Sequence, residues 1–227
     1  MKDLNVWLTY HDDAQIKSYG LKENKIIHLF KGNNLNVSGE SINYLNSFYS
    51  ELTTIYWVWK NNIYSEYVGF CHYRRKFDRI IKLRIKECQV LAITYLPVTL
   101  LQHYKANHNY QDYCDIIDIL IAKYGENNSY SRYMMCSNVF VPFCCFIMHY
   151  TNFEKLCSFV FPILFEFDKK HGLNMQADNY LKKTKMDFPY GIDLSYQQRA
   201  ISFLAERLVS CYIVTNMTPL CVNSVKK

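Results

Sequence analysis

The segment Tyr67-Val-Gly-Phe-Cys-His-Tyr-Arg-Arg75 joins an apolar run to a cluster of cationic and aromatic side chains. The apolar part is typical of a buried β-strand, and the carboxyl ends of strands are where α/β folds bind ligands. Alternation at the strand end would direct His72 and Arg74 to one side and Arg75 to the other. Arginine suits phosphate because its planar guanidinium makes two parallel hydrogen bonds and keeps its charge. We therefore predict an anion site here, with ion pairing of Arg74 and Arg75 to surface carboxylates as the alternative.

Strands and helices are expected to alternate on both sides of this segment. The strand predictions cover residues 4–10, 26–30, 66–73, 89–96 and, as one fully buried strand, 138–148. The helix predictions cover 46–61, 98–123 with a break near 107–109, 153–170 with Pro162 as a kink or break, and 194–212. This order predicts an α/β core in one compact unit whose later part is rich in helix.

The net charge of +6 comes from one short window. Residues 74–86 hold a single acid, Asp78, and seven bases, which are Arg74, Arg75, Lys76, Arg79, Lys82, Arg84 and Lys86. The neutral remainder argues against a nucleic-acid-binding module, which is the alternative function of another class for a basic stretch near tyrosines. Isoleucine and leucine alternate with the last four bases, a pattern that also fits a contact with a membrane surface or a partner.

Composition and missing motifs exclude several classes. Half of the residues are apolar and a fifth are charged, which describes a globular protein. The start of the chain lacks the layout of a secretory signal, and the longest apolar run has only ten residues, so we expect a cytoplasmic protein without membrane spans. The nine cysteines contain no C-x-x-C pair and are expected to be reduced, largely buried thiols rather than zinc ligands.

No glycine-rich phosphate loop, G-x-S-x-G or H-E-x-x-H motif occurs. The sequence also lacks Asp-x-Asp, a common metal–diphosphate clamp; its nearest match, Glu166-Phe-Asp168, is expected on the solvated face of a helix. Any phosphate must therefore be neutralised by other means. Glu51, at the start of the helix Glu51-Leu-Thr-Thr-Ile-Tyr-Trp-Val-Trp-Lys-Asn61, could accept hydrogen bonds from sugar hydroxyls, or it could simply be an early-turn acid favoured by the helix dipole. The aromatic residues of that helix are expected in the core.

The helix 51–61 and the strand 67–77 together resemble a bacterial family of capsular and exopolysaccharide biosynthesis glycosyltransferases, long catalogued only as a domain of unknown function. That family has an E-L-T-x-x-Y-W-x-W-K-N helix followed by a Y-I-G-x-x-H-Y-R-R-x-F strand. The similarity extends to Glu40-Ser-Ile-Asn43, to Tyr104, His108 and Asp112 as Y-x-x-x-H-x-x-x-D, to Phe146-Ile-Met148, and to Tyr196–Arg199 with Phe203–Leu208 as a closing helix. Cys144 and Cys145 replace the usual Asn-Met, which puts acceptor choice in question, and Ser202 replaces a glycine.

The resemblance implies a GT-A-like, Rossmann-type nucleotide-sugar-binding sheet with a helix-rich C-terminal part. It implies one domain, with a nucleotide-sugar-binding half at 1–97 and an acceptor-side half at 98–227. The expected donor is a UDP-sugar, with galactose as the expected hexose, and the expected acceptor is a surface polysaccharide, a lipopolysaccharide glycan or a lipid-linked oligosaccharide. Such an acceptor would place the protein at the inner face of the cytoplasmic membrane, with Arg79, Lys82, Arg84 and Lys86 as its contact.

The resemblance also implies roles for individual residues. Contacts to the nucleotide and diphosphate are expected from Thr9, Tyr10, His11, His72, Arg74 and Arg75, and contacts to the donor sugar from Asn46 and Glu51. Acceptor-side residues are Tyr104 and Arg199. Because an inverting transfer needs a base, Glu206, Asp112 and His108 are the candidates, although Glu206 could instead form an internal ion pair with Arg207. No metal ligand is expected: His72, Arg74 and Arg75 would stabilise the leaving diphosphate, and a Mn²⁺ or Mg²⁺ ion stays open as a cofactor.

Overall fold

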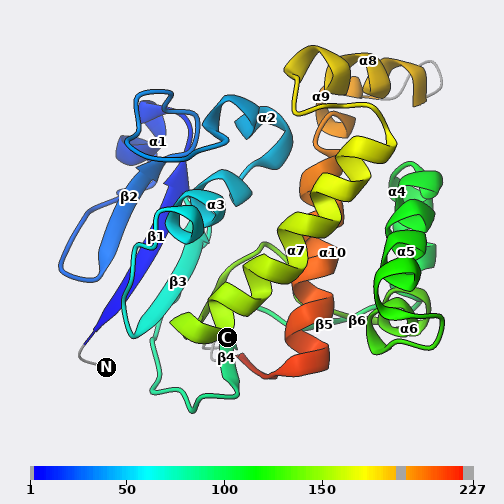
Figure 1. Cartoon of the computed structure of the whole chain (residues 1–227). Helices are drawn as coiled ribbons and strands as arrows, with labels where there is room; N and C mark the ends of the chain where they lie inside the picture. The colour runs from blue at the N-terminus through cyan, green and yellow to red at the C-terminus, as the bar shows by residue number, and fades with distance from the viewer. Residues whose placement is uncertain (1–2, 188–192, 222–227) are drawn as a thin grey trace.

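The computed structural model describes residues 3–187 and 193–221 and contains a six-stranded mixed sheet with helices packed against it (Figure 1). The order of its strands is β2-β1-β3-β7-β4-β8. They are β1 (Leu4–Tyr10), β2 (Ile27–Lys31), β3 (Tyr67–His72), β4 (Glu87–Val90), β7 (Phe146–His149) and β8 (Thr218–Cys221). A separate two-stranded sheet joins β5 (Thr94–Tyr95) to β6 (Val139–Phe140). The predicted mixed α/β fold is confirmed.

The strand directions bring the ends of β1, β2 and β3 to one edge of the sheet. β1 pairs in parallel with both β2 and β3, whereas β7 runs antiparallel to β3 and β4. In this register Thr9 lies opposite both Phe30 and His72. Polar residues that follow three separate strands therefore meet at the same place, the carboxyl edge of the parallel part of the sheet.

The helices are η1 (Asn43–Leu45), α1 (Asp13–Ser18), α2 (Asn46–Tyr49), α3 (Leu52–Lys60), α4 (Leu100–Asn107), α5 (Tyr110–Tyr124), α6 (Ser129–Cys136), α7 (Tyr150–Lys170), α8 (Ala177–Asp187), α9 (Leu194–Gln197) and α10 (Ala200–Asn216). In Figure 1, α7 and α10 lie between the sheet and the group formed by α4, α5 and α6. These two helices carry many of the side chains of the larger core, among them the fully buried Phe153, Leu164 and Leu204. Among the described residues, none of the helices has both the length and the apolar character needed to cross a membrane.

The break between α4 and α5 is confirmed, and local capping explains it. Thr99 and Gln102 form a reciprocal capping box at the start of α4. Asn109 then caps α5 by accepting a hydrogen bond from the backbone N–H of Gln111. His108 lies between the two helices with an extended backbone, so its ring projects from a junction rather than from a helix face.

Four predicted elements are divided in the structure. The strand predicted at 138–148 is β6 and β7, because Phe143 and Cys144 have φ values of 78° and 49° that no strand accommodates. The strand at 89–96 is likewise two short strands in different sheets. The helix at 46–61 is interrupted at Ser50, whose φ is 48°, and the helix at 194–212 is α9 and α10.

Two further predictions were wrong in part: Pro162 is not a break, and only Glu166 of the Glu166-Phe-Asp168 stretch is exposed. Pro162 lies inside α7 without ending it, because the buried neighbours on that helix hold its turns in the core despite the missing N–H. Asp168 is not on a solvated face: it is 4% exposed and accepts hydrogen bonds from the Tyr180 hydroxyl and the Met175 backbone N–H. Trp57 and Trp59 pack against the core as expected, and all nine cysteines are free thiols.

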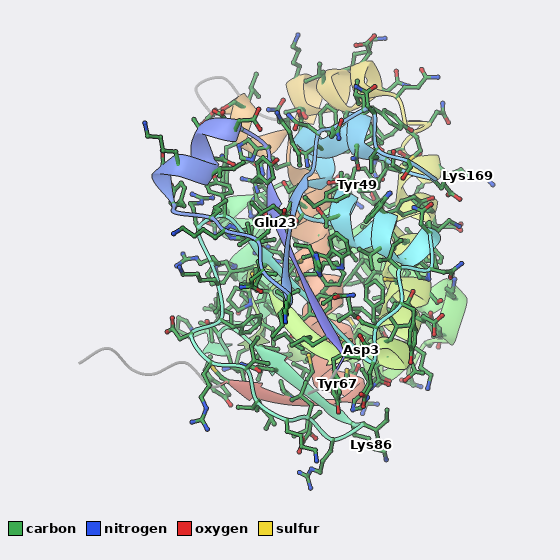
Figure 2. The ribbon with its side chains drawn as sticks, turned by 90° about the vertical axis from the view of Figure 1, so that its left-hand side faces the viewer. Asp3, Glu23, Tyr49, Tyr67, Lys86 and Lys169 are labelled. Atoms are coloured by element: carbon green, nitrogen blue, oxygen red, sulfur yellow. The ribbon has the colours of Figure 1, made fainter. Side chains whose placement is uncertain are left out.

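The basic window extends from one end of the sheet to the other. Arg74 follows β3 at the carboxyl edge, whereas Leu83 accepts a hydrogen bond of 3.2 Å from the hydroxyl of Tyr67, the first residue of β3. Figure 2 shows Lys86 at the same end as Tyr67 and Asp3, away from Tyr49 and Glu23. Arg79, Lys82, Arg84 and Lys86 are all exposed. The basic window 74–86 therefore contributes residues to two separate surfaces, one at each end of the sheet.

Because α7 lies in the centre of the core, we predict that truncating one of its buried side chains destabilises the protein. Replacing the fully buried Leu164 by alanine removes core contacts and leaves a cavity, so Leu164→Ala should lower the free energy of unfolding by about 2–5 kcal/mol. The matched control is Leu35→Ala, at a leucine that is 70% exposed, which should change it by less than about 0.5 kcal/mol. Urea unfolding followed by circular dichroism measures both, and equal effects would contradict this packing.

Candidate functional site

Two pockets meet at the carboxyl edge of the sheet. The strand-end pocket has a volume of about 290 Å³ and is lined by Thr9, His11, Asn33, Asn46, Ser47, Ser50, Glu51, Tyr73, Arg74, Gln198 and Arg199. The helix pocket has a volume of about 420 Å³ and is lined by Glu51, His72, Arg74, His103, Asn107, His108, Phe143, Tyr196, Arg199, Phe203, Glu206 and Arg207. Three residues, Glu51, Arg74 and Arg199, line both pockets and so mark the junction between them.

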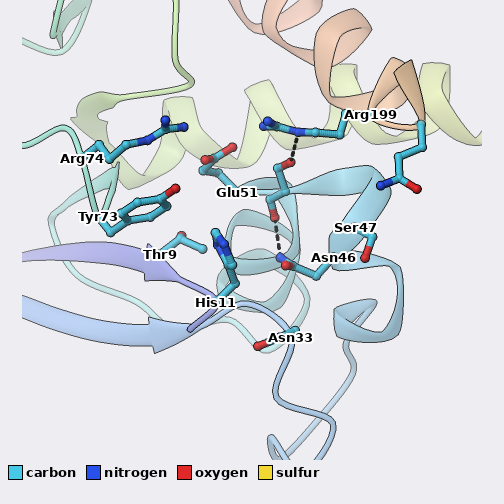
Figure 3. A pocket seen from close by; sticks show the side chains of 11 residues that line it. Thr9, His11, Asn33, Asn46, Ser47, Glu51, Tyr73, Arg74 and Arg199 are labelled. Carbon is cyan, nitrogen blue, oxygen red and sulfur yellow. Dashed lines mark hydrogen bonds between the residues drawn. The ribbon is translucent and has the colours of Figure 1, made fainter. Parts of the chain in front are cut away.

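The three junction residues come from distant parts of the chain. Arg74 follows β3, Glu51 directly precedes α3, and Arg199 lies between α9 and α10. Figure 3 shows the two guanidinium groups on either side of the Glu51 carboxylate. The junction thus places two cations next to one acid at the end of a parallel sheet, an arrangement suited to an anionic ligand.

The turn at Ser50 fixes this geometry. Its carbonyl accepts hydrogen bonds from Asn46 Nδ2 at 3.1 Å and Thr53 Oγ1 at 2.9 Å, which support its left-handed backbone. Arg199 Nε donates to Ser50 Oγ at 3.2 Å, and Ser202 Oγ donates to the Phe48 carbonyl at 2.8 Å. Ser202, which stands where the resemblance expects glycine, therefore helps to attach α10 to the α2–α3 turn.

Gly32 allows the loop after β2 to approach this turn closely. A Cβ atom at this position would lie 2.5 Å from Asn46 Nδ2 and 3.0 Å from Thr53 Oγ1, the same side chains that hold Ser50. Any larger residue would push Asn46 out of place. The backbone N–H of Gly32 donates to the Tyr10 carbonyl at 2.8 Å, which continues the β1–β2 pairing up to the pocket.

Burial and charge set the protonation states at the junction. Burial raises the pKa of the Glu51 carboxyl, and Arg199 and Arg74 act in the opposite direction. Burial, with Arg74, Arg75 and Arg199 nearby, lowers the pKa of His72 to about 4. His72 is therefore neutral at pH 7, and the backbone N–H of Arg74 donates to its Nδ1 at 3.3 Å. The positive charge facing the pockets comes from arginine, and His72 can offer only its Nε2–H as a hydrogen-bond donor.

Several predicted nucleotide-site residues lie at the strand-end pocket, but not all. Thr9 and His11 line it, as do Asn46 and Glu51, which were predicted for the donor sugar. The His11 ring packs against Tyr73 with the ring centroids 5.3 Å apart. Tyr10 points the other way, into the smaller core beneath the opposite face. Arg75 lines neither pocket. Its guanidinium carbon lies over the Phe143 ring, 4.5 Å from the ring centroid.

Glu206 lies in the helix pocket and has two polar partners. Its Oε1 accepts from the Phe143 backbone N–H at 2.9 Å, and its Oε2 is 3.2 Å from Arg207 Nη1. Burial raises the pKa of this carboxyl, although Arg207 opposes the shift. The internal ion pair that the sequence suggested is thus present, and Glu206 nonetheless lines the pocket. The left-handed turn at Phe143 and Cys144 is what brings the Phe143 N–H to it.

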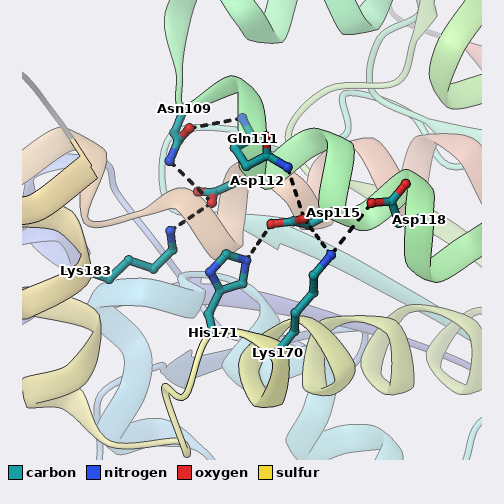
Figure 4. Close-up of polar contacts among 8 residues, drawn as sticks. All are labelled: Asn109, Gln111, Asp112, Asp115, Asp118, Lys170, His171 and Lys183. Atoms are coloured by element: carbon teal, nitrogen blue, oxygen red, sulfur yellow. Dashed lines mark hydrogen bonds and ion pairs between the residues drawn. The ribbon is translucent and has the colours of Figure 1, made fainter.

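Asp112 and Tyr104, which were predicted as site residues, line neither of these two pockets. Tyr104 is fully buried, with the Arg207 guanidinium 5.4 Å from its ring, and does not line either pocket. Figure 4 shows Asp112 in a polar cluster between α5, the end of α7 and α8, where Lys183 Nζ lies 2.8 Å from its carboxylate. His108 is the remaining predicted base, and it does line the helix pocket.

The described residues do not offer a fitting metal site at the junction, where a single carboxylate is flanked by arginines. Among the described residues, one group has ligand atoms close enough for an ion: Asp112, Asp115 and His171, within 4.8 Å of one another. Lysines already bind both of these carboxylates: Lys183 contacts Asp112, and Lys170 Nζ lies 2.6 Å from Asp115 (Figure 4). Hydrated divalent ions require carboxylates that are free to coordinate, so we assign no role to this group.

Sequence reasoning missed part of the pocket wall. Asn33, Ser47, Ser50, Gln198, Tyr196 and Phe203 line the pockets without having been predicted as site residues. Gln198, Tyr196 and Phe203 lie next to Arg199 or within the closing-helix similarity, so the family resemblance could have indicated them. Asn33 and Ser50 lie in turns whose position depends on contacts across the fold.

The family described as a domain of unknown function, DUF4422, matches residues 19–93 and 81–217. The chain belongs to this family. Among solved structures, it is similar to the apo structure of the bifunctional glycosyltransferase WbbM, with a TM-score of 0.70 and 17% sequence identity. The similarity covers 96% of this chain and 44% of WbbM, so the chain spans less than half of that protein. A search of curated proteins found no match.

Because folded His72 is neutral, we predict how the stability of this DUF4422 member depends on pH. In the unfolded chain a histidine protonates near pH 6.5, whereas folded His72 does so at about 4, so acid favours the unfolded state between these values. The free energy of unfolding should therefore fall as the pH decreases from 6.5 towards 4. In His72→Asn this fall should be smaller.

Urea unfolding at several pH values measures the effect. His28→Asn, on β2 outside both pockets, is the control for replacing a histidine. The same pH dependence in wild type and His72→Asn would contradict a buried neutral imidazole.

Proposed function

We propose that this protein is a glycosyltransferase that moves a hexose from a nucleotide sugar to a glycan. The observation behind this proposal is the junction of Arg74, Glu51 and Arg199 between two pockets. Its two arginines could bind a diphosphate, with a pocket on either side for the two reactants. The strand-end pocket would hold the nucleotide, with His11 and Tyr73 as aromatic surfaces for the base. The helix pocket would hold the acceptor. The fold shared with WbbM supports the same activity.

The transfer breaks the bond between the anomeric carbon and the β-phosphate oxygen and forms a bond from that carbon to an acceptor oxygen. The electron pair leaves with the nucleoside diphosphate, whose added charge Arg74 and Arg199 neutralise. Glu51 accepts hydrogen bonds from the donor hexose. The acceptor hydroxyl loses its proton to a base in the helix pocket, where both Glu206 and His108 lie. A carboxyl whose pKa is raised by burial, such as Glu206, is suited to that role.

This proposal changes the role of Arg199. The sequence placed it on the acceptor side, whereas its position in both pockets, with Nε bonded to Ser50, supports a role as a diphosphate ligand. Arg75 becomes a secondary contributor, because its guanidinium stacks on Phe143. Its charge still lies near enough to His72 to lower that pKa.

The finer assignments rest on the family resemblance. They are UDP-galactose as the donor and a growing surface polysaccharide, lipopolysaccharide glycan or lipid-linked oligosaccharide as the acceptor. A lipid-linked acceptor would place the protein at the inner face of the cytoplasmic membrane. The exposed bases Arg79, Lys82, Arg84 and Lys86 support a peripheral contact with anionic lipid.

Removing either junction arginine should weaken nucleotide binding. Charge-assisted hydrogen bonds contribute about 1.5–3 kcal/mol, so Arg74→Ala and Arg199→Ala should each raise the Kd for UDP about 10- to 100-fold and abolish measurable transfer. Arg132→Ala, at an exposed arginine on α6, is the matched control and should bind as wild type does. Calorimetry with UDP and a thermal-shift screen of UDP-, GDP- and CMP-sugars provide the measurements.

Wild-type binding in both junction variants, with the fold intact, would refute the proposed site. The same titration in EDTA tests the role of metal. Since arginines occupy the junction, UDP binding should persist without a divalent cation. A strict requirement for Mn²⁺ would contradict charge neutralisation by the protein alone.

The membrane contact has its own test in vesicle co-sedimentation. The triple variant Arg79→Gln, Lys82→Gln, Lys86→Gln should bind vesicles of phosphatidylglycerol and phosphatidylcholine about 100-fold more weakly, at about 1 kcal/mol for each charge. Arg84 stays unchanged because it pairs with the buried Glu87. The control removes three exposed lysines elsewhere, Lys17, Lys22 and Lys25. Equal loss in both triple variants would exclude a specific surface.

A further inference from the structure

Three aromatic rings form part of the wall of the helix pocket. Tyr196 belongs to α9, His108 lies between α4 and α5, and Phe203 belongs to α10. The centroids of His108 and Phe203 are 4.2 Å apart with planes at 27°, and those of Tyr196 and Phe203 are 4.8 Å apart. Phe203 is 6% exposed, whereas Tyr196 is 48% exposed. The cluster is therefore anchored in the core and presents an accessible aromatic surface to the pocket.

The hydrogen bonds of Gln197 determine which nitrogen of His108 carries the proton. The Asn107 carbonyl can only accept, so the Gln197 amide nitrogen, 3.1 Å away, must donate to it. Gln197 Oε1 then faces His108 Nδ1 at 3.3 Å, and this oxygen can only accept. The proton of the neutral ring must consequently be on Nδ1. His108 Nε2 is left with an unshared electron pair, at a residue that lines the pocket.

Burial and the nearby Arg207 keep His108 in this neutral form. Together they lower its pKa to about 4, against a smaller opposite effect from Gln197. The other charged or titratable groups that line this pocket are Glu51, His72, Arg74, His103, Arg199 and Glu206. Arg207 is 3% exposed, and its Nε has no hydrogen-bond partner among the described residues. The pocket thus offers an acceptor at His108 and an unsatisfied donor in its wall.

We propose that the helix pocket is the subsite for the terminal pyranose ring of the acceptor, which stacks on Tyr196 and donates a hydroxyl hydrogen bond to His108 Nε2. The identity of this ring as an acceptor rests on the proposed function. A pyranose has one face of C–H groups and a rim of hydroxyls, which matches an exposed aromatic surface next to a fixed hydrogen-bond acceptor. Gln197 is a positioning residue: it acts through the tautomer of His108.

The first test uses methyl hexopyranosides (gluco, galacto and manno, both anomers) as probes in saturation-transfer NMR on the full chain, with and without UDP. Wild-type protein should transfer saturation to at least one glycoside. Tyr196→Ala should reduce that signal at least fivefold while the Kd for UDP stays within about twofold. Tyr95→Ala, at a tyrosine on β5 that is 73% exposed, is the matched control and should leave the signal unchanged.

The second test examines Gln197 by long-range ¹H–¹⁵N correlation spectra of the histidine rings. Wild-type His108 should show the Nδ1–H tautomer. Gln197→Leu should populate the Nε2–H tautomer and weaken glycoside binding, whereas Gln197→Glu, which keeps an acceptor opposite Nδ1, should preserve the Nδ1–H form. A Gln197→Leu protein with an unchanged tautomer and unchanged glycoside binding would refute the positioning role.

These outcomes separate the subsite from the proposed activity. Glycoside binding that depends on Tyr196 in a protein that does not bind UDP would support the sugar subsite and refute the nucleotide-sugar function. UDP binding with no glycoside signal, or with a signal insensitive to Tyr196→Ala, would overturn the subsite and leave the proposed donor site intact.

Discussion

The left-handed turn at Ser50 is the constraint on which the site depends. It separates α2 from α3, so that Glu51 directly precedes a new helix at the carboxyl edge of the sheet. Its carbonyl is held from within by Asn46 and Thr53, and its hydroxyl receives Arg199 from the far end of the chain. This turn therefore connects the strand-bearing half to α10. Without it the two pockets would not share a wall, and the arginines would not face each other across Glu51.

The electrostatics of the junction follow from that connection. Arg74 and Arg199 carry like charges, and Glu51 and Glu206 are the nearby acids that offset them. Burial raises the pKa of both acids, because it disfavours their charged forms. The pKa values of His72 and His108 are lowered instead, so both imidazole rings stay neutral at pH 7. A dianionic ligand would relieve the arginine repulsion, whereas the neutral histidines supply direction through hydrogen bonds.

Most elements of the fold could be predicted from periodicity, but their interruptions could not. The break between α4 and α5 was predictable, because Asn109 is a local capping residue. The turns at Ser50 and at Phe143–Cys144 were not, because none of these residues favours a positive φ. Their conformations are supported by distant partners: Arg199 and Ser202 at Ser50, and Glu206 at Phe143. Pro162 shows the reverse case, in which core packing keeps a helix intact through a residue that usually ends one.

The sequence by itself determined the α/β order of elements and the cationic strand end after β3, since both depend on side chains that are near neighbours in the chain. It also pointed to Glu51, Arg74 and Glu206 as site residues. Only the tertiary structure decided that Arg199 belongs to the junction, that Arg75 and Asp112 lie outside both pockets, and that Gln197 orients His108. These facts depend on contacts between residues up to about 150 positions apart, which local patterns do not encode.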